Sequence, residues 1–248
     1  MFQQPKTIHE ALRLRSKYLQ DITPIAGGTD LVVGIRKGRL KITSFLDLSL
    51  LDDWKHIEEL KTEFKIGSLV THCQLEKFEI NVLAQAARTV GGPQIRNRGT
   101  IGGQIGTASP AGDVNTALIA LKAEVELSSL EGTRRVPLSD FFLSPGKNCA
   151  NENELISAIF IPKKRDGLFY KIGKRNAVAI SLIMVAVTKN ENGELGIGIG
   201  CAAPTPVFAD SLEQVNQVTS PITDHRGSSD YRKKMAYIIA QRLIGEIS

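Results

Sequence analysis

Apolar residues near the start of the chain recur with close to helical spacing, at Ile8, Leu12 and Leu19. Thr7 precedes them, and Glu10 stands three residues after Thr7. This spacing has the form of a capping box, in which two side chains bond free backbone amides of the first helical turn. The pattern therefore predicts a helix that begins directly after Thr7.

Further helices are predicted from capping residues and apolar periodicity. Thr71 with Gln74 repeats the capping box and predicts another short helix. Residues 82–90 are expected to form a second helix. The tail pattern is typical of one amphipathic helix, capped by Ser228 or Ser229.

Strands are predicted where β-branched and aromatic residues gather or alternate with polar ones. The segments with this character are 24–26, 42–49, a hairpin over 57–70, 125–127, 154–162, 168–173, 177–188 and 194–202. A turn at residues 191–193 separates the last two strands. The mixture of helices and strands predicts an α+β fold in two parts, with a boundary near residues 162–166.

Composition places the chain among ordinary globular proteins, since 42% of its 248 residues are hydrophobic and 23% are charged. No apolar run reaches the length of a membrane span. The first residues lack the apolar middle and small-residue cleavage site of a signal peptide, so a cytoplasmic location is expected.

Metal binding is not expected. Cys73, Cys149 and Cys201 are far apart and form no CxxC pair, so no zinc site or cysteine-ligated iron–sulfur cluster is encoded. The four histidines are scattered and form no HExxH motif.

The formal net charge is +5, and basic residues gather around 36–41, 163–165 and 171–175. A solvated face is the commoner cause of such runs, and attraction of an anionic partner or nucleotide is the alternative. Nucleic acid is a poor fit, because only 6% of the residues are aromatic and none interleaves with the charges.

Two segments, 26–30 and 100–104, each place two consecutive glycines beside a threonine. We expect both to be loops whose exposed backbone amides form concave anion sites, with the hydroxyl as a further donor. Two such loops could hold the two phosphates of a dinucleotide. Neither contains GxxxxGK[ST] or GxGxxG, and the alternative for each is a tight turn with positive φ.

The second segment continues with small residues from Thr107 and Ala108 through Ser109 to Asp113. Small side chains would let a flat ring lie close to the backbone. Asp113 stands where a helix cap belongs. Its carboxylate could instead accept hydrogen bonds from ribitol or ribose hydroxyls, and the sequence leaves both interpretations open.

Taken together, several segments resemble one known family in the same order. They are PIAGGTDLVV, QIRNRGTIGGQIGTASPAGD, ELISAIFIP, YKIGKR, IGCAAPTP and DHRGSSDYRKKMA. This order is similar to that of the flavin subunit of molybdenum hydroxylases, a group with xanthine dehydrogenases, nicotinate-type hydroxylases and aerobic carbon monoxide dehydrogenases. The resemblance covers nearly the whole chain, and its second glycine motif is long and specific.

The resemblance implies an α+β FAD-binding fold of the vanillyl-alcohol oxidase type over residues 1–165, made of two subdomains split near residues 50–55. A small C-terminal sheet-and-helix domain over residues 166–248 would follow. FAD would lie extended between the subdomains, with its pyrophosphate held by the two Gly-Gly loops.

Carried over by motif, the resemblance implies a set of cofactor-binding residues. The first phosphate loop would be Ala26, Gly27, Gly28, Thr29 and Asp30, and the second would be Thr100, Ile101, Gly102, Gly103 and Gln104. The remaining residues of the implied site are Thr107, Ser109, Asp113, Ile156 and Lys174.

The roles implied for these remaining residues differ. Ser109 and Asp113 would bind the adenosine or ribitol side, and Ile156 would pack on the flavin. Lys174, with its neighbours Lys171 and Arg175, would lie near the flavin and the acceptor nucleotide, although exposed strand charges explain them equally well.

This sequence departs from the family pattern in two places. Gln104 stands where the family usually has asparagine, which puts its contact with FAD in question. The chain is also compact between Leu168 and Asp230, within a surface that would meet partner subunits.

The function implied by the resemblance is electron transfer. The chain would carry FAD, take electrons from iron–sulfur clusters of a small partner subunit, and reduce NAD+ or, in some relatives, a quinone or oxygen. A large partner subunit would hold the molybdenum cofactor and the organic substrate, in a dimer of heterotrimers. No catalytic residue is assigned in this chain. A self-sufficient flavin oxidase of the same fold and a flavin-free scaffold are the alternatives.

Overall fold

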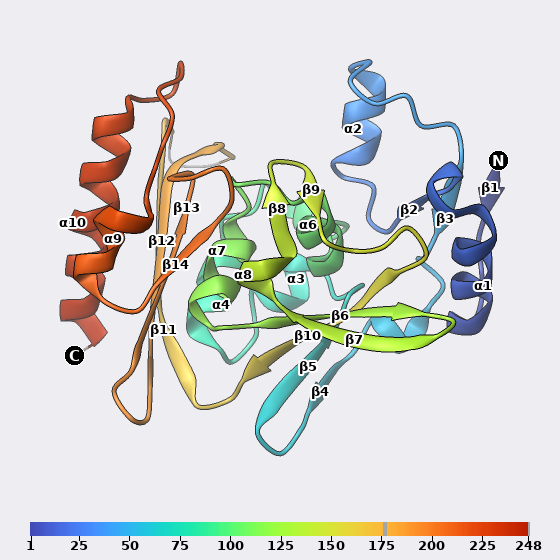
Figure 1. Cartoon of the computed structure of the whole chain (residues 1–248), viewed down its shortest axis with the longest axis horizontal. Helices are drawn as coiled ribbons and strands as arrows, with labels where there is room; N and C mark the ends of the chain where they lie inside the picture. Colours follow the sequence, from blue (N-terminus) through green and yellow to red (C-terminus); the bar gives the residue numbers. More distant parts are fainter. Residues whose placement is uncertain (176–177, 248) are drawn as a thin grey trace.

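Three main β-sheets organise the protein (Figure 1). The structure is a computed structural model that describes residues 1–175 and 178–247. The sheets follow one another along the longest axis of the molecule, in the order of the chain, from the N-terminal sheet to the C-terminal one. None of the described helices is long and apolar enough to cross a bilayer.

The N-terminal sheet is parallel, with strand order β1–β3–β2. Its strands are β1 (Phe2–Gln3), β2 (Thr23–Ile25) and β3 (Phe45–Asp47). The helical elements beside it are α1 (Ile8–Tyr18), η1 (Leu19–Asp21), α2 (Leu31–Arg36) and η2 (Asp52–Trp54). Helix α1 begins as predicted, since the Thr7 hydroxyl accepts the Glu10 amide.

The middle sheet is antiparallel, with strand order β4–β5–β10–β6–β7. Its strands are β4 (Ile57–Glu59), β5 (Glu63–Gly67), β6 (Glu124–Ser129), β7 (Gly132–Pro137) and β10 (Leu155–Pro162), and a separate hairpin joins β8 (Phe142–Ser144) to β9 (Lys147–Asn148). The helices of this part are α3 (His72–Leu75), α4 (Asn81–Arg88), α5 (Pro93–Arg96), α6 (Ile101–Thr107), α7 (Asp113–Ala120) and α8 (Leu138–Phe141).

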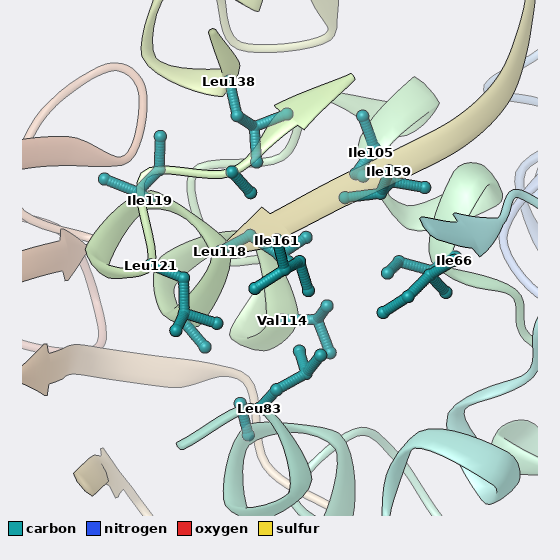
Figure 2. Close-up of a cluster of buried hydrophobic side chains, with 14 of the residues drawn as sticks. Ile66, Leu83, Ile105, Val114, Leu118, Ile119, Leu121, Leu138, Ile159 and Ile161 are labelled. Atoms are coloured by element: carbon teal, nitrogen blue, oxygen red, sulfur yellow. The ribbon is translucent and has the colours of Figure 1, made fainter. Parts of the chain in front are cut away.

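The main hydrophobic core lies between the middle sheet and these helices (Figure 2). Ile66 from β5 and Ile159 from β10 point toward side chains of α6 and α7, among them Ile105 and Leu118. All four of these side chains are fully buried. Burial on this scale contributes about 1.5–3 kcal/mol per large aliphatic side chain.

The C-terminal sheet is antiparallel, with strand order β11–β12–β13–β14. Its strands are β11 (Arg165–Gly173), β12 (Ser181–Asn190), β13 (Leu195–Gly200) and β14 (Val207–Ala209). The helices after it are α9 (Leu212–Val218) and α10 (Ser229–Ile247). Of the two predicted caps, Ser228 bonds the α10 start, because its hydroxyl accepts the Tyr231 amide.

Helices cover both faces of the C-terminal sheet. Since successive residues of a strand point to opposite faces, each face has its own set of residues that contact a helix. On β13, Ile197 and Ile199 join the cluster that buries the apolar face of α10. The alternate residues are Gly196, Gly198 and Gly200, and helix α7 lies directly on them. A Cβ on Gly198 would lie 2.1 Å from the Thr116 carbonyl oxygen, so only glycine permits this helix-to-strand distance.

Most of the predicted elements are present. Several short or exposed elements were not predicted, namely β1, β7, β8, β9, β14, η1, η2, α5, α6, α8 and α9. The expected strand over 177–188 begins in the structure at Ser181. Its first residue, Ala177, lies outside the described residues.

The chain passes from the middle sheet to the C-terminal sheet between Pro162 and Arg165, within the predicted boundary region. The division into domains at residue 165, and the further split near residues 50–55, stay predictions. Phe169 and Met184 of the C-terminal sheet belong to the main core cluster, so the two parts share buried surface.

We expect Gly198→Val to lower the free energy of unfolding by at least about 1–3 kcal/mol, the usual cost of forcing extra carbon into a packed contact. Gly245→Ala is the matched control, because a Cβ there meets nothing within 4 Å, and alanine suits a helix better than glycine. Denaturant unfolding measures both variants. Equal stability of the two variants would contradict the close α7–β13 contact.

Candidate functional site

A cavity of about 930 Å³ lies where the three parts of the chain meet. Its walls come from the segment after β2, from the starts of α6 and α7, and from β10, β11 and residues 178–181. Cavities of this size with convergent polar groups are the usual form of cofactor sites.

The structure brings nearly all of the predicted site residues to this cavity. Those that line it are Ala26, Gly27, Gly28, Thr29, Asp30, Thr100, Gly102, Gly103, Gln104, Thr107, Ser109, Asp113 and Ile156. Two do not. Ile101 is fully buried in the main core, and Lys174 donates instead to the carbonyl of His225 on the protein surface.

The first glycine segment is shaped by backbone contact. A Cβ at Gly27 would lie 1.8 Å from the Arg98 carbonyl oxygen, so the segment touches the chain that precedes the second glycine pair. Gly28 has φ +69°, in the left-handed region that other residues rarely adopt. Gly27 therefore permits a close backbone contact, and Gly28 provides a positive φ.

Backbone N–H groups of this segment are free of protein partners. Within the described residues, no protein acceptor is bonded to the amides of Gly27, Gly28, Thr29 or Asp30. Asp30 directly precedes α2, but its side chain makes no capping bond. A run of unbonded amides on a cavity wall is a ready anion site.

The second glycine segment was wrongly predicted to be a loop. Thr100 caps helix α6, and Gly102 and Gly103 lie in the first turn of that helix. The amides of Ile101, Gly102 and Gly103 bond the Val70 carbonyl, the Ser68 carbonyl and the Thr100 hydroxyl at 2.9–3.1 Å. Because these amides already donate to protein acceptors, the segment offers no free donors at these positions. Its glycines instead allow the backbone to pack closely.

Gln104 connects α6 to α7. Its side-chain oxygen accepts the amides of Asp113 and Val114 at 3.1 and 3.0 Å, in the orientation that its neighbours require. Its NH₂ group donates to His72 Nε2 at 3.1 Å. Gln104, and not Asp113, is therefore the side chain that caps α7.

His72 is buried behind this contact. Burial, with the nearby Arg96 charge, lowers the pKa of His72 to about 4, so the ring is neutral at pH 7. Because Nε2 accepts from Gln104, the proton sits on Nδ1, which has no partner among the described residues. The Ser68 hydroxyl is likewise buried and unbonded, and both residues line the cavity.

Asp113 begins α7 as predicted, but its side chain turns away from a capping position. One carboxylate oxygen accepts Lys171 Nζ at 2.6 Å and the Thr89 hydroxyl at 3.0 Å, and the other accepts the Ser181 hydroxyl at 3.0 Å. Burial raises the pKa of the Asp113 carboxyl, and the Lys171 ammonium opposes that rise. A buried ion pair thus joins α7 to β11 and β12 at the cavity wall.

Charges elsewhere around the cavity are less evenly paired. Glu154 is held by Arg134 through two bonds of 2.6 and 2.8 Å. Among the described residues, Arg15, Lys37, Arg39 and Asp30 line the cavity without forming an ion pair. The unpaired charge of these lining residues is therefore positive on balance.

A family model described as "FAD binding domain in molybdopterin dehydrogenase" matches residues 1–164. The chain belongs to this family. The family assignment and the α+β FAD-binding fold expected from the resemblance are confirmed.

Named relatives of this flavoprotein are subunits of dehydrogenases. It is 38% identical over 192 residues to the nicotinate dehydrogenase FAD-subunit of Eubacterium barkeri, a match that covers 72% of this chain and 64% of that one, slightly under two thirds. It is 28% identical to the carbon monoxide dehydrogenase medium chain of Afipia carboxidovorans, over 98% of this chain and 94% of that one.

A solved structure shows the same fold. The crystal structure of the Cu,Mo-CO dehydrogenase in its cyanide-inactivated form contains a chain that matches with a TM-score of 0.91 at 26% identity, covering 98% of this chain and 96% of that one. The C-terminal sheet and helix are therefore part of the shared architecture.

Sequence reasoning missed His72 and Ser68, and it chose Lys174 over Lys171. A signal for Lys171 was present, because it follows the aromatic Phe169 by two residues in a predicted strand, and residues i and i+2 of a strand share a face. In the structure, Phe169 belongs to the main core. Lys174 lies just beyond the end of β11. No local sequence pattern indicates that His72 and Ser68 are buried.

The low pKa of His72 predicts acid sensitivity. The unfolded chain takes up this proton near pH 6.5 and the folded chain only near pH 4, so stability falls as pH drops between those values. Compared with His72→Gln, the wild type should lose up to about 3 kcal/mol more unfolding free energy from pH 7 to 4. Denaturant titrations across this range measure it, and a constant difference would contradict it.

The Asp113–Lys171 pair should behave as one unit. Asp113→Ala leaves the Lys171 ammonium buried without its counter-charge, which costs about 3–5 kcal/mol of unfolding free energy. Lys171→Ala likewise leaves the Asp113 carboxylate buried without its counter-charge. The double variant should lose less than the sum of the two single losses, and additive losses would argue against a coupled pair.

Proposed function

We propose that this chain is the FAD-carrying electron-transfer subunit of a multi-subunit molybdenum hydroxylase. It takes electrons from iron–sulfur clusters of a small partner subunit and reduces NAD+. A large subunit holds the molybdenum cofactor and the organic substrate, and the complex is a dimer of heterotrimers in the cytoplasm. The family match and the names of the relatives support the proposal.

The cavity fits FAD by its own chemistry. Unbonded amides of Gly27 to Asp30, with unpaired cations lining the same cavity, suit a dianionic pyrophosphate. The α6 residues Gly103, Gly106 and Thr107, with Ile156 of β10, line the cavity with small or uncharged groups. This combination of a charged region and an uncharged wall is the single observation that carries the proposal.

Within this proposal, each part of the wall has a role. The amides after β2 hold the phosphates. Thr107, Ser109 and Ile156 flank the remainder of the cofactor, and the Lys171 ammonium, fixed by Asp113, contributes a positioned donor. FAD itself supplies the redox chemistry when bound, while the protein sets its position and electrostatic surroundings.

The relatives support placing substrate choice outside this chain. Their names include dehydrogenases of nicotinate, glyceraldehyde and carbon monoxide, three molecules that differ in size and in functional groups. A common flavin chain combined with different large subunits accounts for this range. A quinone or oxygen, which the family resemblance gives as other acceptors, is the alternative against which NAD+ is tested.

We expect the purified chain, loaded with FAD, to show the absorbance bands of oxidised flavin and to lose them when NADH is added without air. Bands that resist NADH but bleach with dithionite would keep the FAD subunit and remove NAD+ as the acceptor. A chain that takes up no FAD, alone or with its partner subunits, would contradict the proposal.

Gly27→Val gives this experiment a structural control. A side chain there collides with the Arg98 carbonyl, which displaces the segment that carries the free amides. The variant should therefore lose FAD, whereas Gly245→Ala, distant from any contact, should retain it.

A further inference from the structure

A rigid turn ends helix α2 beside the cavity. Gly38 has φ +68°, its amide bonds the Ile35 carbonyl, and the Arg39 amide bonds the Gly34 carbonyl, each at 2.9 Å. These two bonds with a left-handed glycine form a Schellman motif. Leu40 then packs on Gly34, where a Cβ would lie 2.6 Å from its Cδ1. The backbone around Gly38 is thus fixed.

This turn separates four nearby cations into two groups. Lys37 and Arg39, on either side of Gly38, line the cavity, whereas Arg36 and Lys41 do not. In the described part of the chain, neither Lys37 nor Arg39 has a carboxylate partner. Both side chains are exposed, so the fold does not need them as internal ties.

Apart from Asp30, the other charged groups of the cavity have partners of their own and do not neutralise Lys37 and Arg39. Lys171 is paired with Asp113, and Glu154 is paired with Arg134. Arg15 is tied by Nη1 to the carbonyls of Leu19 and Ile22.

Asp30 is the one unpaired carboxylate among the described lining residues, against three unpaired cations. Its single charge cannot neutralise them. The lining therefore carries an excess of positive charge, which suits an anionic ligand.

We propose that Lys37 and Arg39 form a two-cation clamp that closes on the pyrophosphate of a dinucleotide held by the free amides of residues 27–30. This assignment rests on the proposed function and adds specificity to it. The amides recognise phosphate oxygens by direction, and the clamp neutralises two adjacent negative charges. The clamp therefore selects a pyrophosphate over an uncharged or singly charged ligand.

The test compares two double variants with the same change in net charge. Lys37→Gln/Arg39→Gln removes the clamp, and Arg36→Gln/Lys41→Gln removes the two cations outside the cavity. FAD affinity is measured by titration of the apoprotein at low and high ionic strength. ADP, which carries the pyrophosphate without the flavin, is measured by displacement of FAD.

The clamp variant should bind FAD about tenfold more weakly at low ionic strength, and ADP by the same factor. The outer variant should change by less than about twofold, because exposed charges outside the cavity are screened. The difference between wild type and clamp variant should shrink at high ionic strength. Thermal unfolding of the two apoproteins should be alike.

Other outcomes separate the two proposals. If both double variants lose affinity equally, the clamp is wrong while FAD binding stands. If FAD weakens and ADP does not, the two cations act on another part of the ligand, and the pyrophosphate assignment is wrong. If the wild type binds no FAD even with partner subunits, the proposed function itself fails.

Discussion

The structure depends on the close approach of helix α7 to strand β13. Thr116 of α7 presents its carbonyl where a Gly198 side chain would otherwise stand, so the helix lies on the strand backbone itself. The same approach brings the start of α7 against β11 and β12, which buries Asp113 between Lys171 and Ser181. One contact therefore sets the relation of the middle and C-terminal sheets and also builds a wall of the cavity. The buried Asp113–Lys171 pair spans this junction, so it links the two sheets directly at the cavity wall.

The two Gly-Gly pairs show how one dipeptide serves two purposes. Around Gly27 and Gly28, close contact and a left-handed φ leave a row of amides unbonded. Gly102 instead allows α6 to pack on the chain at Ser68, and the amides of Gly102 and Gly103 bond protein acceptors. The cavity consequently has a polarity: free donors and unpaired cations lie on the α2 side, and paired or neutral groups lie on the α7 side. An extended dinucleotide, with its charge concentrated in the pyrophosphate, has the same uneven distribution.

Local signals predicted much of the fold, and long-range contacts explain the errors. The caps at Thr7 and Thr71 are present, because a capping box involves residues only three apart. Helix α6 was missed since glycine is a poor helix former, and only packing against Ser68 makes it acceptable there. Capping was one of two interpretations left open for Asp113, and Gln104 performs it instead, because the partners of both side chains come from other segments of the chain. Most cavity-lining residues were nevertheless named, since their motif is continuous in sequence and the fold carries it to the cavity as a block.

The titratable groups of the cavity are arranged to hold charge, and those described are poorly placed to move protons. Asp113 and Glu154 are committed to Lys171 and Arg134, and His72 is kept neutral by burial with its Nε2 bonded to Gln104. A general acid or base needs a pKa near the working pH and access to the reacting atom. These groups lack that combination, so the chain contributes position and electrostatic potential, and the bound cofactor contributes reactivity. Under the proposed function, such a site places no requirement on the organic substrate, which agrees with relatives named for nicotinate, glyceraldehyde and carbon monoxide.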